Sequence, residues 1–193
     1  GKLMVRRAED VLTARATIVL DLRPSRHAGI GPVASAEVAI TAAASATRHL
    51  DERGRGVVVL DRPVQRSPSA LPAAQWLRRL AELESEEVDV DALLRQVAAG
   101  VAEHGTLLAI VPLPRDEELH GLVRAGRSAT SRLALIIDAG TFAGRGPDPA
   151  VDRSVAGLVA AGWRAAPLRH GDDLAERWRS LIGQGRRHGV KAV

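Results

Sequence analysis

Five short, largely apolar runs divide the chain, and each has the length of one β-strand. They are Ala16–Asp21, Gly56–Leu60, Leu107–Val111, Leu133–Asp138 and Arg164–Leu168. Successive residues in most of these runs are apolar, which is typical of strands that are covered by helices on both faces. The runs therefore predict a buried, mainly parallel sheet.

The longest helical pattern follows the first run. The segment 35–54 predicts a helix over Ala36–Leu50, with Ser35 as its N-cap and Gly54 as its C-terminal stop. The first three turns are almost entirely small or apolar residues. We therefore expect this helix to lie against the sheet and to pack on Ala16–Asp21 through its alanines.

Four further segments, 73–83, 88–105, 116–126 and 148–163, also show helical spacing. The acidic stretch 82–91 joins the first two of them and is interpreted as a solvated, capping link. The basic segment 183–193 has no periodicity and is expected to be a flexible tail. These patterns predict one α/β domain over 1–182.

Strands that alternate with helices predict right-handed crossovers and a doubly wound, mainly parallel sheet with helices on both faces, a Rossmann-like fold. In open sheets of this kind, ligands bind outside the carboxyl ends of the strands. Asp21, Pro112 and Asp138, with the loops that follow them, should therefore share one edge.

The charge balance changes this picture little. The 193 residues include 27 Lys or Arg and 23 Asp or Glu, a formal charge of +4, although the pI is about 10.7. The pI is high because nearly every cation is Arg and the chain has no Tyr or Cys. Aromatic residues make up only 2%, whereas single-strand binders rely on aromatic stacking. We therefore expect no nucleic-acid partner.

Motifs for catalysis or cofactor binding are missing from the sequence. It has no cysteine, which excludes disulfides and thiolate chemistry. It also lacks a G-x-x-x-x-G-K-[ST] loop, a G-x-S-x-G elbow and an H-E-x-x-H pair. The sequence thus predicts no enzyme and no cofactor. The alternative is an enzyme on an anionic small molecule, which would use Arg23, Arg26 and a helix start near Ser35.

One stretch has the composition of a metal site. The residues Asp21-Leu22-Arg23-Pro24-Ser25 place an aspartate at the end of a predicted buried strand, with a serine four positions later. Together with the small-residue helix that follows, this order resembles a von Willebrand factor A-type domain, whose first strand ends in D-x-S-x-S. The resemblance implies that these oxygens, with a Thr and an Asp from two later loops, would hold Mg²⁺, a hard cation that prefers oxygen ligands.

The sequence departs from that pattern in all three loops. Arg23 replaces the middle serine and brings a permanent positive charge. The third-loop aspartate is replaced by Pro-Leu-Pro, and Asp116 comes late, on a predicted helix. The nearest candidates for the threonine are Ser67 and Ser69.

These departures predict a degenerate site at Asp21, Arg23 and Ser25 that binds no metal. Asp21 would instead pair with Arg23 or cap a neighbouring loop. The alternative is a Mg²⁺-dependent adhesion-type module, in which the ion bridges to a carboxylate of a partner.

A second resemblance covers the chain from Gly1 to about Arg179. It is carried by "GKLMVRRAED", "ATIVLDLR", "EVAITAAASATRHL", "GVVVLD", "QWLRRLAEL" and "AAGWRAAPLRHGDDLAERW" in that order. These segments resemble the von Willebrand A-like C-terminal half of the bacterial family called domain of unknown function 58. The resemblance implies a non-enzymatic partner of a MoxR-type AAA+ ATPase in assembly or chaperone-like work. It also implies a membrane-anchored parent protein, with this part on the cytoplasmic side.

The surface expected to bind the partner is formed by the loops Arg23–Val33, Pro112–Arg115 and Ala139–Pro149, which the topology places at one sheet edge. Exposed arginines and aromatic residues are typical of contact hot spots. We expect Phe142 to be exposed there beside Ile30 and Leu113; the alternative is that Phe142 folds back onto the core. The predicted partner-binding residues are Arg23, Arg26, His27, Arg115, Phe142 and Arg145.

Overall fold

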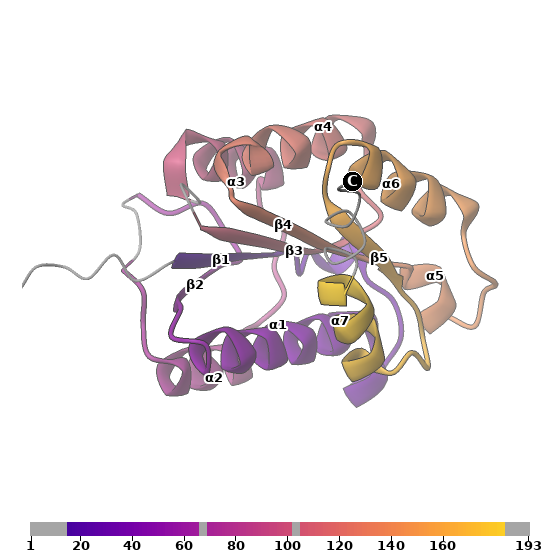
Figure 1. The fold of residues 1–193 in the computed structure, drawn as a ribbon. Coiled ribbons are helices and arrows are strands. Elements are labelled where there is room, and N and C mark those ends of the chain that lie inside the picture. The colour runs from indigo at the N-terminus through magenta and orange to yellow at the C-terminus, as the bar shows by residue number, and fades with distance from the viewer. Residues whose placement is uncertain (1–14, 66–68, 102–104, 184–193) are drawn as a thin grey trace, which may run out of the picture.

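The computed structural model describes residues 15–65, 69–101 and 105–183. Five parallel strands form one sheet in the order β2-β1-β3-β4-β5 (Figure 1). Their bounds are β1 Arg15–Leu20, β2 Gly56–Leu60, β3 Thr106–Pro112, β4 Ser131–Ile137 and β5 Arg164–Leu168. The predicted doubly wound, Rossmann-like α/β fold is therefore confirmed.

β1 is an interior strand, as predicted, because β2 and β3 pair with it on either side. Ile18 has Val59 as its partner on one side and Leu108 on the other. An isolated antiparallel bridge joins Val57 to Leu71 beside the edge strand β2. The chain moves from β1 to β2 and then crosses to β3 on the opposite side of β1. The loops after β1 and β3 consequently diverge at the topological switch point, where ligands bind in open α/β sheets.

Helices cover both faces of the sheet (Figure 1). One face carries α1 (Ser35–Asp51), α2 (Ala73–Ala81) and α7 (Leu174–Gly183). The other carries α3 (Val90–Gln96), α4 (Asp116–Ala125) and α6 (Pro149–Ala160). The short α5 (Ala139–Phe142) directly follows β4. None of the described helices is both long and apolar enough to span a membrane.

The remaining described elements are short helical turns that are wound more tightly or more widely than an α-helix. The 3₁₀ turns are η1 (Pro24–Arg26), η2 (Gly31–Val33) and η4 (Gly126–Ser128), and a π-helical turn, η3 (Val97–Val101), extends α3. Part of the helix expected over 88–105 therefore changes its hydrogen-bonding pattern, and its positions 102–104 lie outside the described residues. The tail expected at 183–193 likewise lies outside them from 184 onward.

α1 packs on the sheet through small residues, as the sequence predicts. Ala39, Ala43 and Ala46 are buried in the same cluster as Ile18 of β1. The prediction that Ser35 is the N-cap is wrong. Ala34 holds that position, and Ser35 is the first residue of the helix and is fully buried. Gly54 does end the segment, because it has a φ of +70° that favours glycine.

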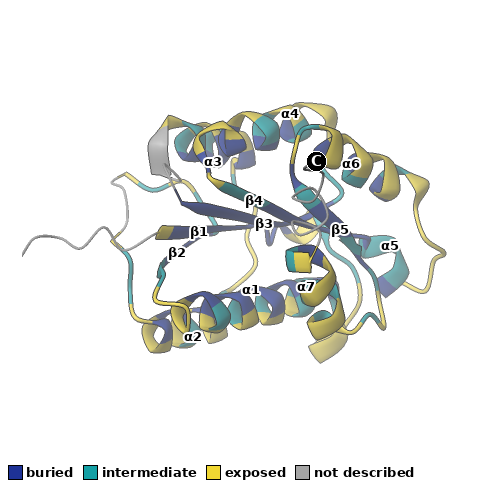
Figure 2. Cartoon of the chain, in the orientation of Figure 1, coloured by how far each residue is buried: buried dark blue, intermediate teal, exposed yellow. Residues whose placement is uncertain are grey.

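The core has two halves, one on each face of the sheet. Figure 2 shows buried strands between helices whose outward sides are exposed. Neighbouring residues of one strand belong to different halves: Leu108 faces α1, and Leu107 faces α3 and α4. Helix α7 was not expected from the sequence. Its apolar residues Trp178 and Leu181 complete the half that contains α1.

Candidate functional site

The carboxyl ends of β1, β3 and β4 lie at one edge, as the topology predicts. The backbone N–H of Asp21 donates to the Ile110 carbonyl at 3.1 Å, and that of Asp138 donates to the Leu168 carbonyl at 2.9 Å. The loop after β3 follows the same ladder, because Leu113 N–H donates to the Ile137 carbonyl at 3.2 Å. Two buried carboxylates, Asp21 and Asp138, therefore stand on this edge.

Both carboxylate oxygens of Asp21 accept hydrogen bonds from Arg23. Oδ1 accepts from Nε at 2.9 Å and from the Arg23 backbone N–H at 3.1 Å, while Oδ2 accepts from Nη2 at 2.6 Å. This bidentate arrangement is the strongest common form of a carboxylate–guanidinium pair. The predicted pairing of Asp21 with Arg23 is confirmed.

Glu118 is a second carboxylate on the same guanidinium. Its Oε1 lies 2.9 Å from Arg23 Nη2, and its Oε2 accepts the backbone N–H of Arg115 at 2.8 Å. Arg26 Nη2 lies 3.8 Å from Glu118 Oε2 and donates to the Leu113 carbonyl. The loops after β1 and β3 are thus joined across the switch point by one alternating network of charges.

Arg23 lies between two anions and is almost fully enclosed. Only 7% of the residue is exposed, against 2% for Asp21 and 5% for Glu118. The hydrogen bond that Arg23 donates to Asp21 has the largest effect and raises the pKa of Arg23. Burial comes next and lowers this pKa, and the charge of Asp21 raises it. The guanidinium therefore stays charged and occupies the acceptor atoms that a metal ion at Asp21 would need. Among the described residues, no group of three or more His, Asp or Glu side chains could hold a metal.

His27 fixes the next part of the loop. Its Nε2 lies 2.8 Å from the Asp21 carbonyl oxygen and its Nδ1 lies 2.9 Å from Ser35 Oγ. A carbonyl can only accept, so Nε2 carries the proton and Nδ1 accepts from the Ser35 hydroxyl. Ser35 Oγ in turn accepts the backbone N–H of Ala28 at 2.9 Å. Burial lowers the pKa of His27, which favours this neutral form.

This serine–histidine pair is not arranged for nucleophilic catalysis. Ser35 is fully buried, so no substrate atom reaches its hydroxyl. Its oxygen already exchanges hydrogen bonds with His27 and Ala28. The pair instead closes the loop between β1 and α1, since the Ser35 N–H also donates to the Ala28 carbonyl at 2.9 Å.

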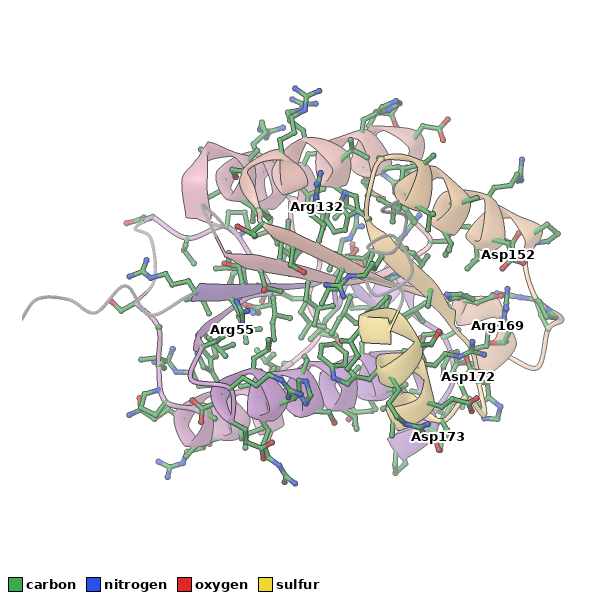
Figure 3. All side chains as sticks on the ribbon, in the orientation of Figure 1. Arg55, Arg132, Asp152, Arg169, Asp172 and Asp173 are labelled. Carbon is green, nitrogen blue, oxygen red and sulfur yellow. The ribbon has the colours of Figure 1, made fainter. Side chains whose placement is uncertain are left out.

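Asp138 belongs to a second network beside the first. Its Oδ2 accepts the backbone N–H of Asp148 at 2.9 Å and lies 3.3 Å from Arg169 Nε. Arg169 Nη2 also pairs with Asp152 of α6 at 2.7 Å, and both residues are labelled in Figure 3. Burial lowers the pKa of Arg169, whereas its hydrogen bonds to Asp152 and Asp138 raise it. Together these effects leave the pKa of Arg169 above its ordinary value.

A cleft of about 400 Å³ opens between the two networks. It is lined by the ends of β3 and β4, the loop after β1 and the beginning of α6. Of the predicted partner-binding residues, Arg26 and Arg145 line this cleft together, as expected for arginines on one face. Arg115 is exposed nearby, in the loop after β3.

The expected exposure of Phe142 is wrong, and the stated alternative, that it folds back onto the core, is what the structure shows. Phe142 is only 9% exposed, because it packs in the core half of α1 and against the His170 ring at 5.5 Å. Arg23 is enclosed by its carboxylates and presents almost no surface to a partner. Leu113 is half-buried, whereas Ile30 is 92% exposed as expected. Ser67 lies outside the described residues.

Glu118 is the site residue that the sequence interpretation missed. It lies 95 positions beyond Arg23, so no local spacing connects the two. One signal was present: an acidic residue at the third position of a helix commonly accepts the backbone N–H of the residue before that helix. Glu118 makes this bond to Arg115, which orients its other oxygen toward Arg23.

Comparison with known proteins found no matching family model, no matching curated protein and no matching solved structure. The family resemblance stated from the sequence is consequently a proposal, and the site is interpreted from its geometry.

Proposed function

We propose that this chain is a non-enzymatic protein-interaction domain whose strand-end site holds an internal cation in place of a metal. The observation that carries this proposal is the position of the Arg23 guanidinium, bonded to Asp21 and 2.9 Å from Glu118. A dication at the same place would have to displace a charge that is covalently attached to the chain.

The surroundings of the site support binding rather than catalysis. The hydroxyl of Ser35 is buried, His27 is held by hydrogen bonds at both ring nitrogens, and Asp138 is paired with Arg169. A general base must reach the proton that it removes, and these groups are already committed to their neighbours. The loops they hold are therefore suited to present a fixed surface.

The partner in this proposal is a MoxR-type AAA+ ATPase, and the work is assembly or chaperone-like, at the cytoplasmic side of a membrane. This part follows from the resemblance to the bacterial family called domain of unknown function 58. The loops at the carboxyl edge are the proposed contact, because they combine exposed Ile30 with Arg26, Arg115 and Arg145.

The partner is tested with the purified chain and the purified MoxR-type ATPase of the same organism. We expect saturable binding by biolayer interferometry, and no binding to an unrelated AAA+ ATPase at the same concentration. Failure of the chain to bind, in a sample with the circular dichroism of a folded α/β protein, would contradict the proposed partner.

The metal-free character of the site is tested by calorimetry on the chain alone. Millimolar Mg²⁺ or Mn²⁺ should give no saturable heat, because Arg23 occupies both oxygens of Asp21. Saturable heat that disappears in the Asp21→Asn variant would instead support the Mg²⁺-dependent adhesion module.

A further inference from the structure

The cleft at the carboxyl edge has a composition suited to a particular ligand. Its walls include apolar atoms of Pro112, Leu113 and Val151, and two arginines, Arg26 and Arg145, also line it. It lies next to the topological switch point between β1 and β3. Apolar walls with a few polar groups are the usual composition of a binding site.

Each acidic side chain of the cleft has one carboxylate oxygen bonded. Asp138 Oδ2 accepts from the Asp148 N–H and lies 3.3 Å from Arg169 Nε. Asp148 Oδ1 accepts the N–H of Ala150 at 2.8 Å, where it caps the start of α6. The positive end of the helix dipole and Arg169 thus offset these two carboxylates.

The two arginines keep free donors. Arg145 is exposed, and within the described residues its guanidinium forms no ion pair or hydrogen bond. Arg26 uses one nitrogen, Nη2, for the Leu113 carbonyl and Glu118. Because a guanidinium has five N–H donors arranged as a fork, the remaining donors of this pair are complementary to a carboxylate.

An exposed apolar group lies further along the loop after β1, the loop that contributes Arg26 to the cleft. Ile30 is 92% exposed, on a loop that runs along α5, since a Cβ on Gly29 would lie 3.1 Å from the Phe142 carbonyl oxygen. Hydrogen bonds from Ala28 to Ser35 and from Ala34 to Gly31 hold this loop. An exposed apolar side chain on a fixed loop needs little ordering when it is buried in a complex.

We propose that this surface binds an acidic segment of a protein partner. A Glu or Asp carboxylate of the partner lies between Arg26 and Arg145, and an apolar residue next to it packs against Ile30. The proposal rests on the proposed function in taking the ligand to be a protein. It adds the chemistry of the segment that is recognised.

The experiment uses the whole chain and the peptide acetyl-Leu-Glu-Glu-Leu-amide, with acetyl-Leu-Gln-Gln-Leu-amide as the matched neutral peptide. Binding is followed by ¹⁵N NMR at the Nε–H groups of Arg26 and Arg145 and at the amides of Gly29 and Gly31. We expect saturable shifts with the acidic peptide and about tenfold weaker binding of the neutral one, as expected when a charge-assisted contact is lost.

Variants assign the effect to the cleft. Arg26→Gln together with Arg145→Gln should weaken the acidic peptide about tenfold or more, and Ile30→Ser should weaken both peptides. The control is Arg78→Gln, an exposed arginine of α2, which should leave binding unchanged. Helix α2 lies toward the opposite end of the molecule in Figure 1. Equal binding of both peptides, no saturable shift, or equal effects of the cleft variant and the control would each overturn the proposal.

The result also separates this inference from the proposed function. If the acidic peptide does not bind at the cleft and the ATPase binds the wild-type chain and the cleft variant equally, the acidic-segment site is wrong while the partner stands. If the acidic peptide binds at the cleft but the ATPase does not bind, the partner is wrong and the site for an acidic segment is supported.

Discussion

At the scale of single residues, Arg23 determines what the strand-end site can do. A serine at its position would leave Asp21 and Glu118 facing each other as two buried anions, which is a suitable environment for a cation. Arg23 supplies that cation from the chain itself, with two bonds to Asp21 and a contact of 2.9 Å to Glu118. Because guanidinium is planar, always charged and weakly hydrated, it suits a buried pair better than lysine does.

Replacing Arg23 by Ala should destabilise the fold strongly. The change leaves two carboxylates, Asp21 and Glu118, buried without their counter-charge, and breaking a buried pair in this way costs about 3–5 kcal/mol. Urea unfolding followed by circular dichroism measures the loss of unfolding free energy.

The control is Arg48→Ala, which removes an exposed pair with Glu52 and should cost at most about 0.5 kcal/mol. A loss no larger than that of the control would show that the buried network does not stabilise the fold.

At the scale of elements, hydrogen bonds and two glycine turns fix the loop from His27 to Ser35. His27 joins the end of β1 to the first residue of α1 through two hydrogen bonds. Gly29 and Gly31 have positive φ values, +92° and +68°, so the chain reverses there without a side-chain clash. Of the two, only Gly29 lies close to another element, because a Cβ built on it would come within 3.1 Å of the carbonyl oxygen of Phe142, the last residue of α5.

The two glycines provide a matched pair of variants. Gly31→Ala places a residue in the left-handed region with open space around its Cβ, which costs about 1–2 kcal/mol. Gly29→Ala carries the same kind of penalty and also brings Cβ to 3.1 Å from Ala34 Cα and the Phe142 oxygen. Thermal unfolding should therefore show a clearly larger loss for Gly29→Ala. Equal losses would mean that the loop does not pack on α5 as described.

The elements themselves were largely predictable, because their signal is local. The run Gly56–Leu60 is apolar at four consecutive positions, and the observed strand β2 has the same bounds. The run Arg164–Leu168 likewise coincides with β5. Helix α7 was missed, although Leu174, Trp178 and Leu181 repeat at helical spacing, because these three apolar residues stand among charged and polar ones and give a weaker pattern than the other helices.

The site was predictable only where it is local. The pair Asp21–Arg23 lies two positions apart and was expected, whereas Glu118 depends on how α4 is placed after β3. Phe142 was expected on the surface because its own segment is rich in glycine. Its burial comes instead from the α1 side of the core and from His170, which sequence distance hides.

At the scale of the whole molecule, one sheet is shared by two core halves. Because side chains alternate along a strand, Leu107 and Leu108 of β3 are both fully buried but face opposite halves. The tryptophans divide in the same way: Trp163 belongs to the half of α3, α4 and α6, while Trp76 and Trp178 belong to the half of α1. In the part of the chain that the structure describes, both halves share this one sheet, so neither should fold without the other.

Leu107→Ala and Leu108→Ala should therefore each destabilise both halves together. Each change removes a fully buried leucine and should cost about 2–5 kcal/mol of unfolding free energy. The measurement uses two backgrounds, one that keeps only Trp163 and one that keeps only Trp178, with Phe at the other tryptophan positions. Urea transitions followed by fluorescence should coincide in both backgrounds. For each leucine variant, the transition should shift by the same amount in the two backgrounds, as a single cooperative unit requires.

The control is Val159→Ala on α6, a 49% exposed position, which should shift neither transition appreciably. A Leu107→Ala transition that moves for Trp163 but not for Trp178 would show that the two halves unfold independently, and that the sheet does not join them into one unit.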